Sequence, residues 1–285
     1  MLLLRADLSG GKRSPGRDAS MLQVDFAQIS HPGLVRDTNE DYLGCFVPQT
    51  REEARLRGWL FALADGVGGQ DRGEVASRIS VETLVAGFRS AAPGEPLITL
   101  LPRLVQSANL NVFETALHTL GGSSMATTLV ACALRFDRAA IAHAGDSRCY
   151  LIRKGCAVQL TRDHTVSNEQ LRMGILTTRE AASAATAHLL SRSLGAAMFL
   201  NVEVSEHQIF AGDLLLLCSD GLHRSVSAEE LARIVRQAGN LSSACEQLVA
   251  LANQRDGSDN ISLQLIRIQS VERVGMYRGR HYKIQ

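Results

Sequence analysis

Four aspartates flank strand-like stretches in distant parts of this chain. Asp65 and Asp220 each follow a short apolar run and precede a glycine, and Asp41 and Asp259 also lie beside strand-like segments. A carboxylate at the end of a buried strand costs free energy unless a partner offsets its desolvation, and an adjacent glycine lets the backbone approach that partner. The four aspartates therefore predict an oxygen-lined site for hard divalent cations.

Each aspartate can be given a different task in a site for two ions. Such a site needs a carboxylate that bridges both ions, together with terminal carboxylates and waters. Asp65 suits the bridge because it ends a predicted strand, and Gly66 can offer its carbonyl at close range. Asp220 and Asp259 are expected to supply terminal oxygens. A single Asp-Gly pair is more often a turn, but four such acidic sites together favour the metal interpretation.

Arg36 lies five residues before Asp41. A guanidinium beside a metal cluster can bind two oxygens of a phosphate dianion. The alternative is a surface ion pair with Asp37 or Glu40, and the residues alone leave both interpretations open.

The hydrophobic pattern predicts strands and helices that occur in blocks. Strands grouped together, followed by helices grouped together, indicate an α+β layered domain and not a doubly wound sheet. Three strands in 125–153 are joined by short turns, which predicts an antiparallel meander. The predicted strands are 22–30, 43–47, 59–64, 125–134, 139–144, 149–153, 202–209, 213–218 and 260–268, and the predicted helices are 71–90, 97–119, 227–238 and 241–254.

The same pattern predicts one folded domain between two less ordered ends. Residues 1–20 are expected to form a flexible N-terminal extension, 21–270 the domain, and 271–285 a solvated basic tail. Within the domain, 161–188 is rich in Thr, Ser, Ala and Arg and has only short helical patterns, so it is expected to form a surface flap.

The composition is that of an ordinary globular protein. Hydrophobic residues make up 45% of the chain, charged residues 21%, and the formal net charge is +1, so no global field favours nucleic acid. The longest aliphatic run, 214–217, is too short to span a membrane. The six cysteines are scattered without a Cys-x-x-Cys pair, which favours reduced core thiols. We therefore expect a cytoplasmic monomer.

Five sequence motifs occur in a recognisable order along the chain. The chain resembles the metal-dependent Ser/Thr protein phosphatases, the PPM or type 2C family, and in particular their bacterial branch. The resemblance covers residues 24 to 268. The motifs are Arg36 with Asn39-Glu40-Asp41, Ala64-Asp65-Gly66-Val67-Gly68-Gly69, Gly145-Asp146-Ser147-Arg148, Cys218-Ser219-Asp220-Gly221-Leu222 and Ser258-Asp259-Asn260-Ile261.

The resemblance implies a fold and a first set of ligands. The fold is a central sandwich of two antiparallel sheets flanked by helix pairs. Two Mn²⁺ or Mg²⁺ ions are bridged by Asp65, and the Gly66 carbonyl binds one of them. Asp220 and Asp259 complete the first ligand set, and Asp41 holds metal-bound waters.

The resemblance also implies a third metal site and a phosphate-binding arginine, and the chain departs from the family at one position. Asp146 and Asp220 match the carboxylates that hold a third, weaker ion in bacterial members, and Ser183 matches another contact of that ion. Arg36 matches the phosphate-binding arginine. Many eukaryotic members carry a histidine where this chain has Val67, which cannot donate a proton, so a metal-bound water becomes the first candidate for the general acid.

The implied activity is hydrolysis of phosphoserine and phosphothreonine in proteins. A hydroxide bridging the two metals would attack phosphorus without a phosphoenzyme. The implied partners are phosphorylated proteins and a bacterial Ser/Thr kinase whose action the chain opposes. Two alternatives are a catalytically silent relative that acts as a regulatory binding module, and a phosphatase dedicated to a single phosphorylated regulator.

Overall fold

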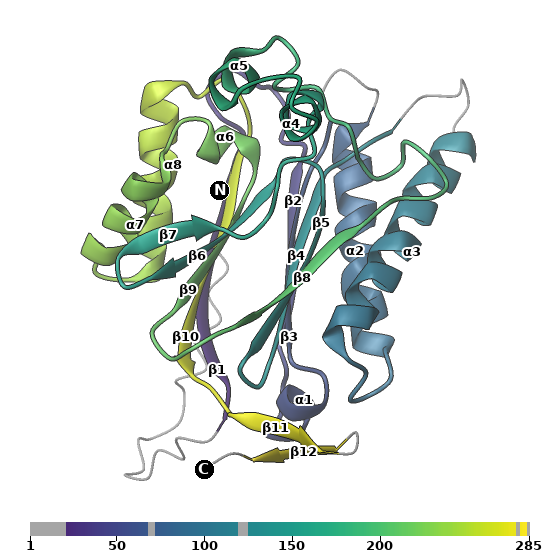
Figure 1. Cartoon of the computed structure of the whole chain (residues 1–285), viewed down its shortest axis with the longest axis vertical. Coiled ribbons are helices and arrows are strands. Elements are labelled where there is room, and N and C mark those ends of the chain that lie inside the picture. The colour runs from purple at the N-terminus through teal and green to yellow at the C-terminus, as the bar shows by residue number, and fades with distance from the viewer. Residues whose placement is uncertain (1–20, 68–71, 119–124, 278–279, 284–285) are drawn as a thin grey trace.

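The computed structural model describes residues 21–67, 72–118, 125–277 and 280–283. It shows two five-stranded antiparallel sheets packed face to face, with one pair of long helices over each outer face (Figure 1). The expected α+β sandwich is therefore confirmed. Within these described ranges, no helix combines the length and the apolar character needed to cross a membrane.

The first sheet has the strand order β2-β3-β4-β5-β8. Its second strand, β3, buries both faces, since Leu60 and Ala62 contact the outer helices while Phe61 and Leu63 point towards the second sheet. The strands are β2 (Asp41–Phe46), β3 (Trp59–Asp65), β4 (Leu129–Arg135), β5 (Arg138–Ala144) and β8 (Glu203–Gln208).

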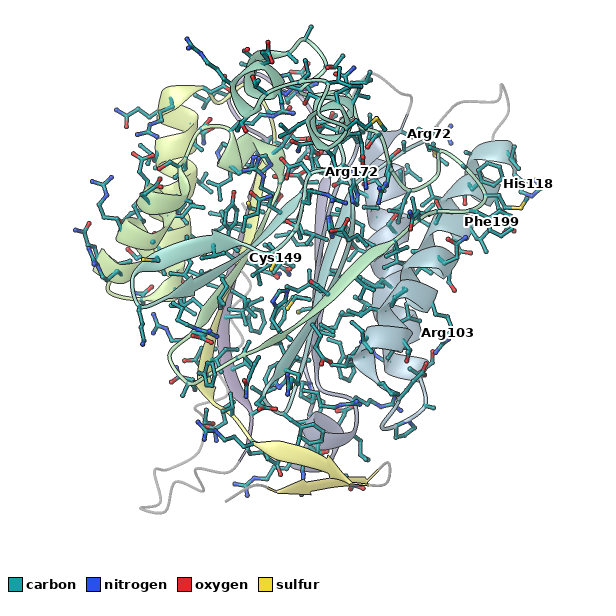
Figure 2. All side chains as sticks on the ribbon, viewed as in Figure 1. Arg72, Arg103, His118, Cys149, Arg172 and Phe199 are labelled. Atoms are coloured by element: carbon teal, nitrogen blue, oxygen red, sulfur yellow. The ribbon has the colours of Figure 1, made fainter. Side chains whose placement is uncertain are left out.

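The second sheet has the order β1-β10-β9-β6-β7. Between the sheets lies an apolar core in which Cys149 is buried with Phe61, Leu217 and Ile266, and the side chains of both sheets fill this space (Figure 2). The strands are β1 (Gln23–His31), β6 (Arg148–Arg153), β7 (Cys156–Gln159), β9 (Leu214–Cys218) and β10 (Ile261–Ser270).

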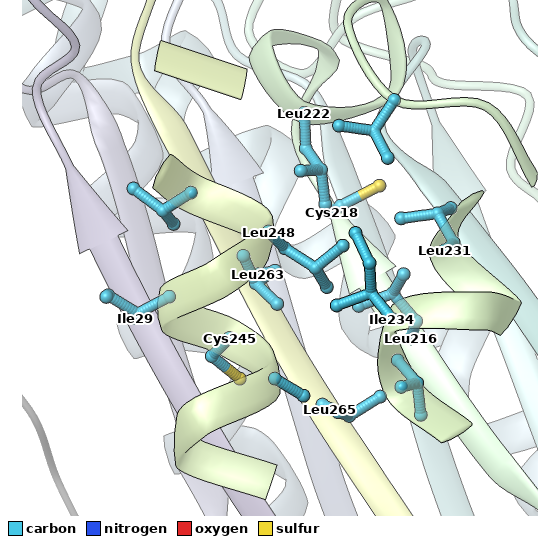
Figure 3. Close-up of a cluster of buried hydrophobic side chains, with 14 of the residues drawn as sticks. Ile29, Leu216, Cys218, Leu222, Leu231, Ile234, Cys245, Leu248, Leu263 and Leu265 are labelled. Atoms are coloured by element: carbon cyan, nitrogen blue, oxygen red, sulfur yellow. The ribbon is translucent and has the colours of Figure 1, made fainter. Parts of the chain in front are cut away.

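Two helix pairs close the sandwich. α2 (Gly73–Ser90) and α3 (Leu97–His118) cover the first sheet, and α7 (Ala228–Gln237) and α8 (Leu241–Arg255) cover the second (Figure 1). On the second face, Leu231 and Ile234 of α7 pack with Cys245 and Leu248 of α8 against the sheet (Figure 3). Ser227 caps the N-terminus of α7 and forms a capping box with Glu230.

Shorter elements connect this framework. α4 and α5 lie within the segment 161–188, the expected flap. β11 and β12 form an antiparallel hairpin within 271–285, the expected basic tail. The bounds are α1 (Arg51–Leu56), α4 (Val166–Arg172), α5 (Thr178–Ser183), α6 (Asp220–His223), β11 (Val274–Tyr277) and β12 (Arg280–Lys283). The expected extension 1–20 lies outside the described residues, and the boundaries of the 21–270 domain stay predictions.

The predicted three-strand meander over 125–153 is wrong. β4 and β5 pair as expected, but β6 pairs with β7 and β9 in the second sheet. The chain changes sheet at Gly145, whose φ of +109° favours glycine, and a Cβ there would lie 2.6 Å from Thr128. Strand periodicity shows which faces are buried but not which sheet a strand joins.

Candidate metal centre

The first sheet brings two of the predicted aspartates together at one edge. Asp41 begins β2 and Asp65 ends β3, and the two residues are direct partners in the antiparallel register. The start of one strand and the end of its antiparallel neighbour necessarily lie at the same edge. This pairing explains how two motifs that are separated in sequence contribute to one site.

The second sheet places the other three aspartates at the same end. Cys218 at the end of β9 is paired with Leu263 near the start of β10 and with Arg148 at the start of β6. The residues just beyond these strand ends are therefore neighbours. They are Asp220 after β9, Asp259 before β10 and Asp146 before β6.

Hydrogen bonds join the two sheets at this end. The Ser219 hydroxyl donates to Asp41 Oδ2 at 2.9 Å, and Asn260 Oδ1 accepts from the Glu40 backbone N–H at 2.8 Å. The Asn260 side-chain amide also donates to the carbonyls of Pro32 and Thr38. These contacts fix the loop that carries Arg36 relative to both sheets.

Two threonines of the first sheet hold Asp65 in place. The Asp65 N–H donates to Thr128 Oγ1 at 3.1 Å, and its carbonyl accepts from the Thr127 hydroxyl at 2.8 Å. Thr128 Oγ1 also lies 2.6 Å from Ser147 Oγ, beside Asp146. The sequence could not predict that Thr127 and Thr128 belong to the site, because hydrogen bonding to a neighbouring strand leaves no periodic signal.

Burial and mutual repulsion both disfavour the ionised aspartates. Burial raises the pKa of Asp41 to about 7, with smaller contributions from Asp220 and Asp259. Burial also raises the pKa of Asp65 well above its usual range, and Asp41, Asp220, Asp146 and Asp259 raise it further. Cations bound among these carboxylates would favour the ionised forms of Asp41 and Asp65 at neutral pH.

The residues present fit a divalent metal centre. The centre offers carboxylate and carbonyl oxygens, which are the donors that Mn²⁺ and Mg²⁺ prefer. Asp41 Oδ1 is buried and has no hydrogen-bond partner, so one acceptor remains to bind a further ligand. Gly66 is enclosed so tightly that a Cβ there would lie 2.5 Å from the Gly73 backbone.

Arg36 lies at the rim of this centre. Its Nε is 3.1 Å from Asp259 Oδ1, and 45% of its side chain is exposed. Its partner is thus Asp259, and neither Asp37 nor Glu40, the two partners considered from sequence. The pair places the guanidinium directly beside a predicted metal ligand.

The structure also adds an arginine that sequence reasoning missed. Arg224 Nη2 lies 2.6 Å from Asp220 Oδ2 and 3.7 Å from Asp146 Oδ2. Burial raises the pKa of Asp146 to about 7, and Asp220 raises it too, whereas Arg224 lowers it. The available signal was the spacing of four residues between Asp220 and Arg224, which places both on one face of a helical turn.

Two further predicted contacts lie apart from the aspartates. The Ser183 hydroxyl is exposed and donates to the carbonyls of Arg179 and Glu180 in α5, so it makes no contact with the carboxylates here. Val67 donates its backbone N–H to Ala126 O and has no side-chain proton to give.

His143, His164 and Glu203 form a second group of possible ligands in the described part of the chain. The imidazole rings stack with centroids 4.6 Å apart, and burial lowers the pKa of His164 to about 4. Their polar atoms already have partners: His143 Nε2 contacts Arg162 O, Gly145 N–H donates to His164 Nδ1, and Arg162 pairs with Glu203 at 2.7 Å. This group therefore joins the flap to the first sheet and is better suited to packing than to binding a metal.

The chain matches known phosphatases over most of its length. A family model described as "Protein phosphatase 2C" matches residues 38–260. The serine/threonine phosphatase stp of Listeria innocua is 32% identical over 251 residues, which cover 87% of this chain and 95% of that protein. The crystal structure of the Mycobacterium tuberculosis serine/threonine phosphatase PstP/Ppp has a TM-score of 0.77 and 30% identity, covering 87% of this chain and 100% of that one.

A metal-bound structure is among the similar folds. The catalytic domain of the serine/threonine protein phosphatase PstP in complex with two manganese ions has a TM-score of 0.75 and 31% identity. The match covers 88% of this chain and 100% of that one. Together with the family match, these relatives show that this chain belongs to the protein phosphatase 2C family and to its bacterial branch.

Proposed function

We propose that this phosphatase hydrolyses phosphoserine and phosphothreonine in proteins, and that Asp65 would serve as a ligand to both of two Mn²⁺ or Mg²⁺ ions. The observation that carries the proposal is the convergence of Asp41, Asp65, Asp220 and Asp259 at one end of the sandwich, with Arg36 at its rim. The named relatives favour this catalytic function over a silent binding module.

The ligand roles follow from how the residues are held. The Asp65 carboxylate interacts electrostatically with all four of the other aspartates, so it is suited to bind two ions. The Gly66 carbonyl, Asp220 and Asp259 would supply further oxygens. Asp41 keeps Oδ2 on Ser219 and has Oδ1 available to orient a bound water.

The remaining steps depend on the protein's own side chains. When bound, the ions would supply Lewis acidity and lower the pKa of water towards neutrality. Arg36 binds Asp259 through Nε, which leaves its two Nη groups available to bind phosphate oxygens. Val67 cannot protonate the leaving oxygen of serine or threonine, so water is the first candidate for the proton donor.

The cellular setting is also part of this proposal. Phosphoproteins made by a Ser/Thr kinase are the expected substrates, and a cytoplasmic monomer is the expected form. All six cysteines are free, and Cys132, Cys149, Cys218 and Cys245 are buried in the core. Free core thiols are typical of a reducing compartment.

Substrate class can be tested with three phosphopeptides of one sequence. Purified protein with Mn²⁺ should release phosphate from the phosphothreonine and phosphoserine peptides and much less from the phosphotyrosine peptide, and EDTA should stop the reaction. Arg36→Gln should lower kcat/KM by about 10- to 100-fold, because a charge-assisted contact to phosphate is lost. Arg51→Gln removes the same charge at an exposed position on α1 and should have no effect. Preference for phosphotyrosine, or undiminished activity of Arg36→Gln, would contradict the proposal.

A further inference from the structure

We propose that the Arg224 guanidinium is a built-in cation for Asp146 and Asp220 that excludes a third divalent ion, so that this enzyme works with two. The inference rests on the proposed function, because it concerns the same metal centre. It assigns to Arg224 a positioning role that holds both carboxylates in place.

The guanidinium lies between the two carboxylates. Its Nη2 is 2.6 Å from Asp220 Oδ2 and 3.7 Å from Asp146 Oδ2. The carboxylates are about nine-tenths buried, with 12% and 8% of their side chains exposed, whereas 32% of the Arg224 side chain is exposed. Two carboxylates share one cation here, and a guanidinium stays charged at every physiological pH.

Local backbone structure fixes the arginine in this position. α6 is a single helical turn that begins at Asp220, and the Arg224 N–H donates to Asp220 O at 3.0 Å to close it. The preceding residue, His223, contacts the Asp146 carbonyl through Nε2 at 3.0 Å. His223 and Arg224 therefore both hold Asp146. His223 contacts its backbone carbonyl, and Arg224 lies beside its carboxylate.

Charge, and not lack of access, would exclude a third ion. A cavity of about 550 Å³ is lined by Asp146, Arg224, Asp163 and Thr165, so a hydrated ion can reach Asp146. To bind both, it would have to displace the guanidinium from Asp220 while that charge stayed nearby, and like charges at such distances repel strongly. Ser183, which would contribute to a third-ion site by resemblance, bonds within α5 instead.

Counting bound Mn²⁺ tests the inference without measuring activity. Equilibrium dialysis should give two Mn²⁺ per wild-type chain in the concentration range where both proposed sites fill. Arg224→Gln should bind a third ion, with an affinity at least about tenfold higher than any third binding by the wild type. Asp146→Asn in the Arg224→Gln background should abolish this gain. Arg233→Gln removes an exposed arginine that pairs with Glu230 on α7, so it should bind two ions as the wild type does.

The outcomes separate this inference from the proposed function. A wild type that binds two Mn²⁺ and turns over substrate, alongside a folded Arg224→Gln that also binds only two, overturns the inference and leaves the function intact. A wild type that binds three ions with similar affinities overturns it as well, whether or not the variant folds. A wild type that binds no Mn²⁺ and is inactive would instead contradict the proposed function.

Discussion

At the scale of single residues, the metal centre is a set of aspartates whose burial costs free energy. Burial is the main reason that the pKa of Asp65 is raised, and Asp41 is the next largest contributor. Asp65 and Asp41 are placed by neutral groups, the Thr128 and Ser219 hydroxyls, and these offset little of the charge. The protein therefore depends on cations to stabilise the arrangement that it builds.

Metal-free protein should become less stable as the pH rises. The pKa values of Asp41 and Asp146 are about 7 in the folded chain, against 3.8 as the ordinary value. Between these values the folded chain holds protons that the unfolded chain has released, so the free energy of unfolding falls as the pH increases towards 7. Unfolding in urea with EDTA should show a lower stability at pH 8 than at pH 5, by on the order of a few kcal/mol. Mn²⁺ should restore it at pH 8, and equal stability at both pH values without metal would contradict this prediction.

Thr128→Val tests the support of Asp65. The variant removes the acceptor of the Asp65 N–H and the contact with Ser147 Oγ, and leaves buried groups without partners. We expect a loss of about 1–3 kcal/mol in the free energy of unfolding, together with a lower kcat. Thr99→Val changes an exposed threonine bonded only within its own helix turn and should cost less than about 0.5 kcal/mol. Equal effects of the two variants would show that Thr128 has no special role.

At the scale of elements, strand ends and one helical turn build the centre. β2, β3, β9 and β10 end or begin at the same side of the sandwich, so short loops suffice to bring the aspartates together (Figure 1). α6 then fits closely against the residue before β10. A Cβ on Gly221 would lie 2.2 Å from the Asn260 carbonyl oxygen.

Gly221→Ala should displace α6 and with it Asp220 and Arg224. We expect Mn²⁺ affinity to fall by about tenfold or more and the melting temperature to drop, because backbone atoms on both sides must move. Gly239→Ala is the matched control, since a Cβ there meets no atom within 4 Å. Calorimetric titration and thermal unfolding measure both quantities. Wild-type Mn²⁺ affinity in Gly221→Ala would indicate that α6 can move without disturbing the centre.

At the scale of the whole molecule, local pattern predicted much of the fold. The long helices and the nine predicted strands occur within a few residues of their expected positions, because alternation and helical spacing report burial directly. The placement of β6 could not be predicted, since its burial pattern would suit either sheet. Short elements such as α6 carry too few residues for a periodic signal, which is why Arg224 was missed.

The sequence predicted the aspartates of the site but not the partner of Arg36. The sequence predicted Asp41, Asp65, Asp220 and Asp259 because each lies beside a strand-like stretch, and Asp146 only through the family resemblance. The structure places all five at one end of the sandwich. The partner of Arg36 was not found, because Asp259 lies far along the chain and only the packed sheets bring the two together.

The central claim is that Asp65 makes hydrolysis depend on bound metal. The most direct measurement is phosphate release from a phosphothreonine peptide during a Mn²⁺ titration of wild type, Asp65→Asn and Asp25→Asn, the last an exposed change on β1. Metal-dependent release should be equal in wild type and Asp25→Asn and at least about 1,000-fold slower in folded Asp65→Asn, which corresponds to about 4 kcal/mol of lost transition-state stabilisation. Release by the wild type in EDTA, or undiminished release by Asp65→Asn, would contradict the account.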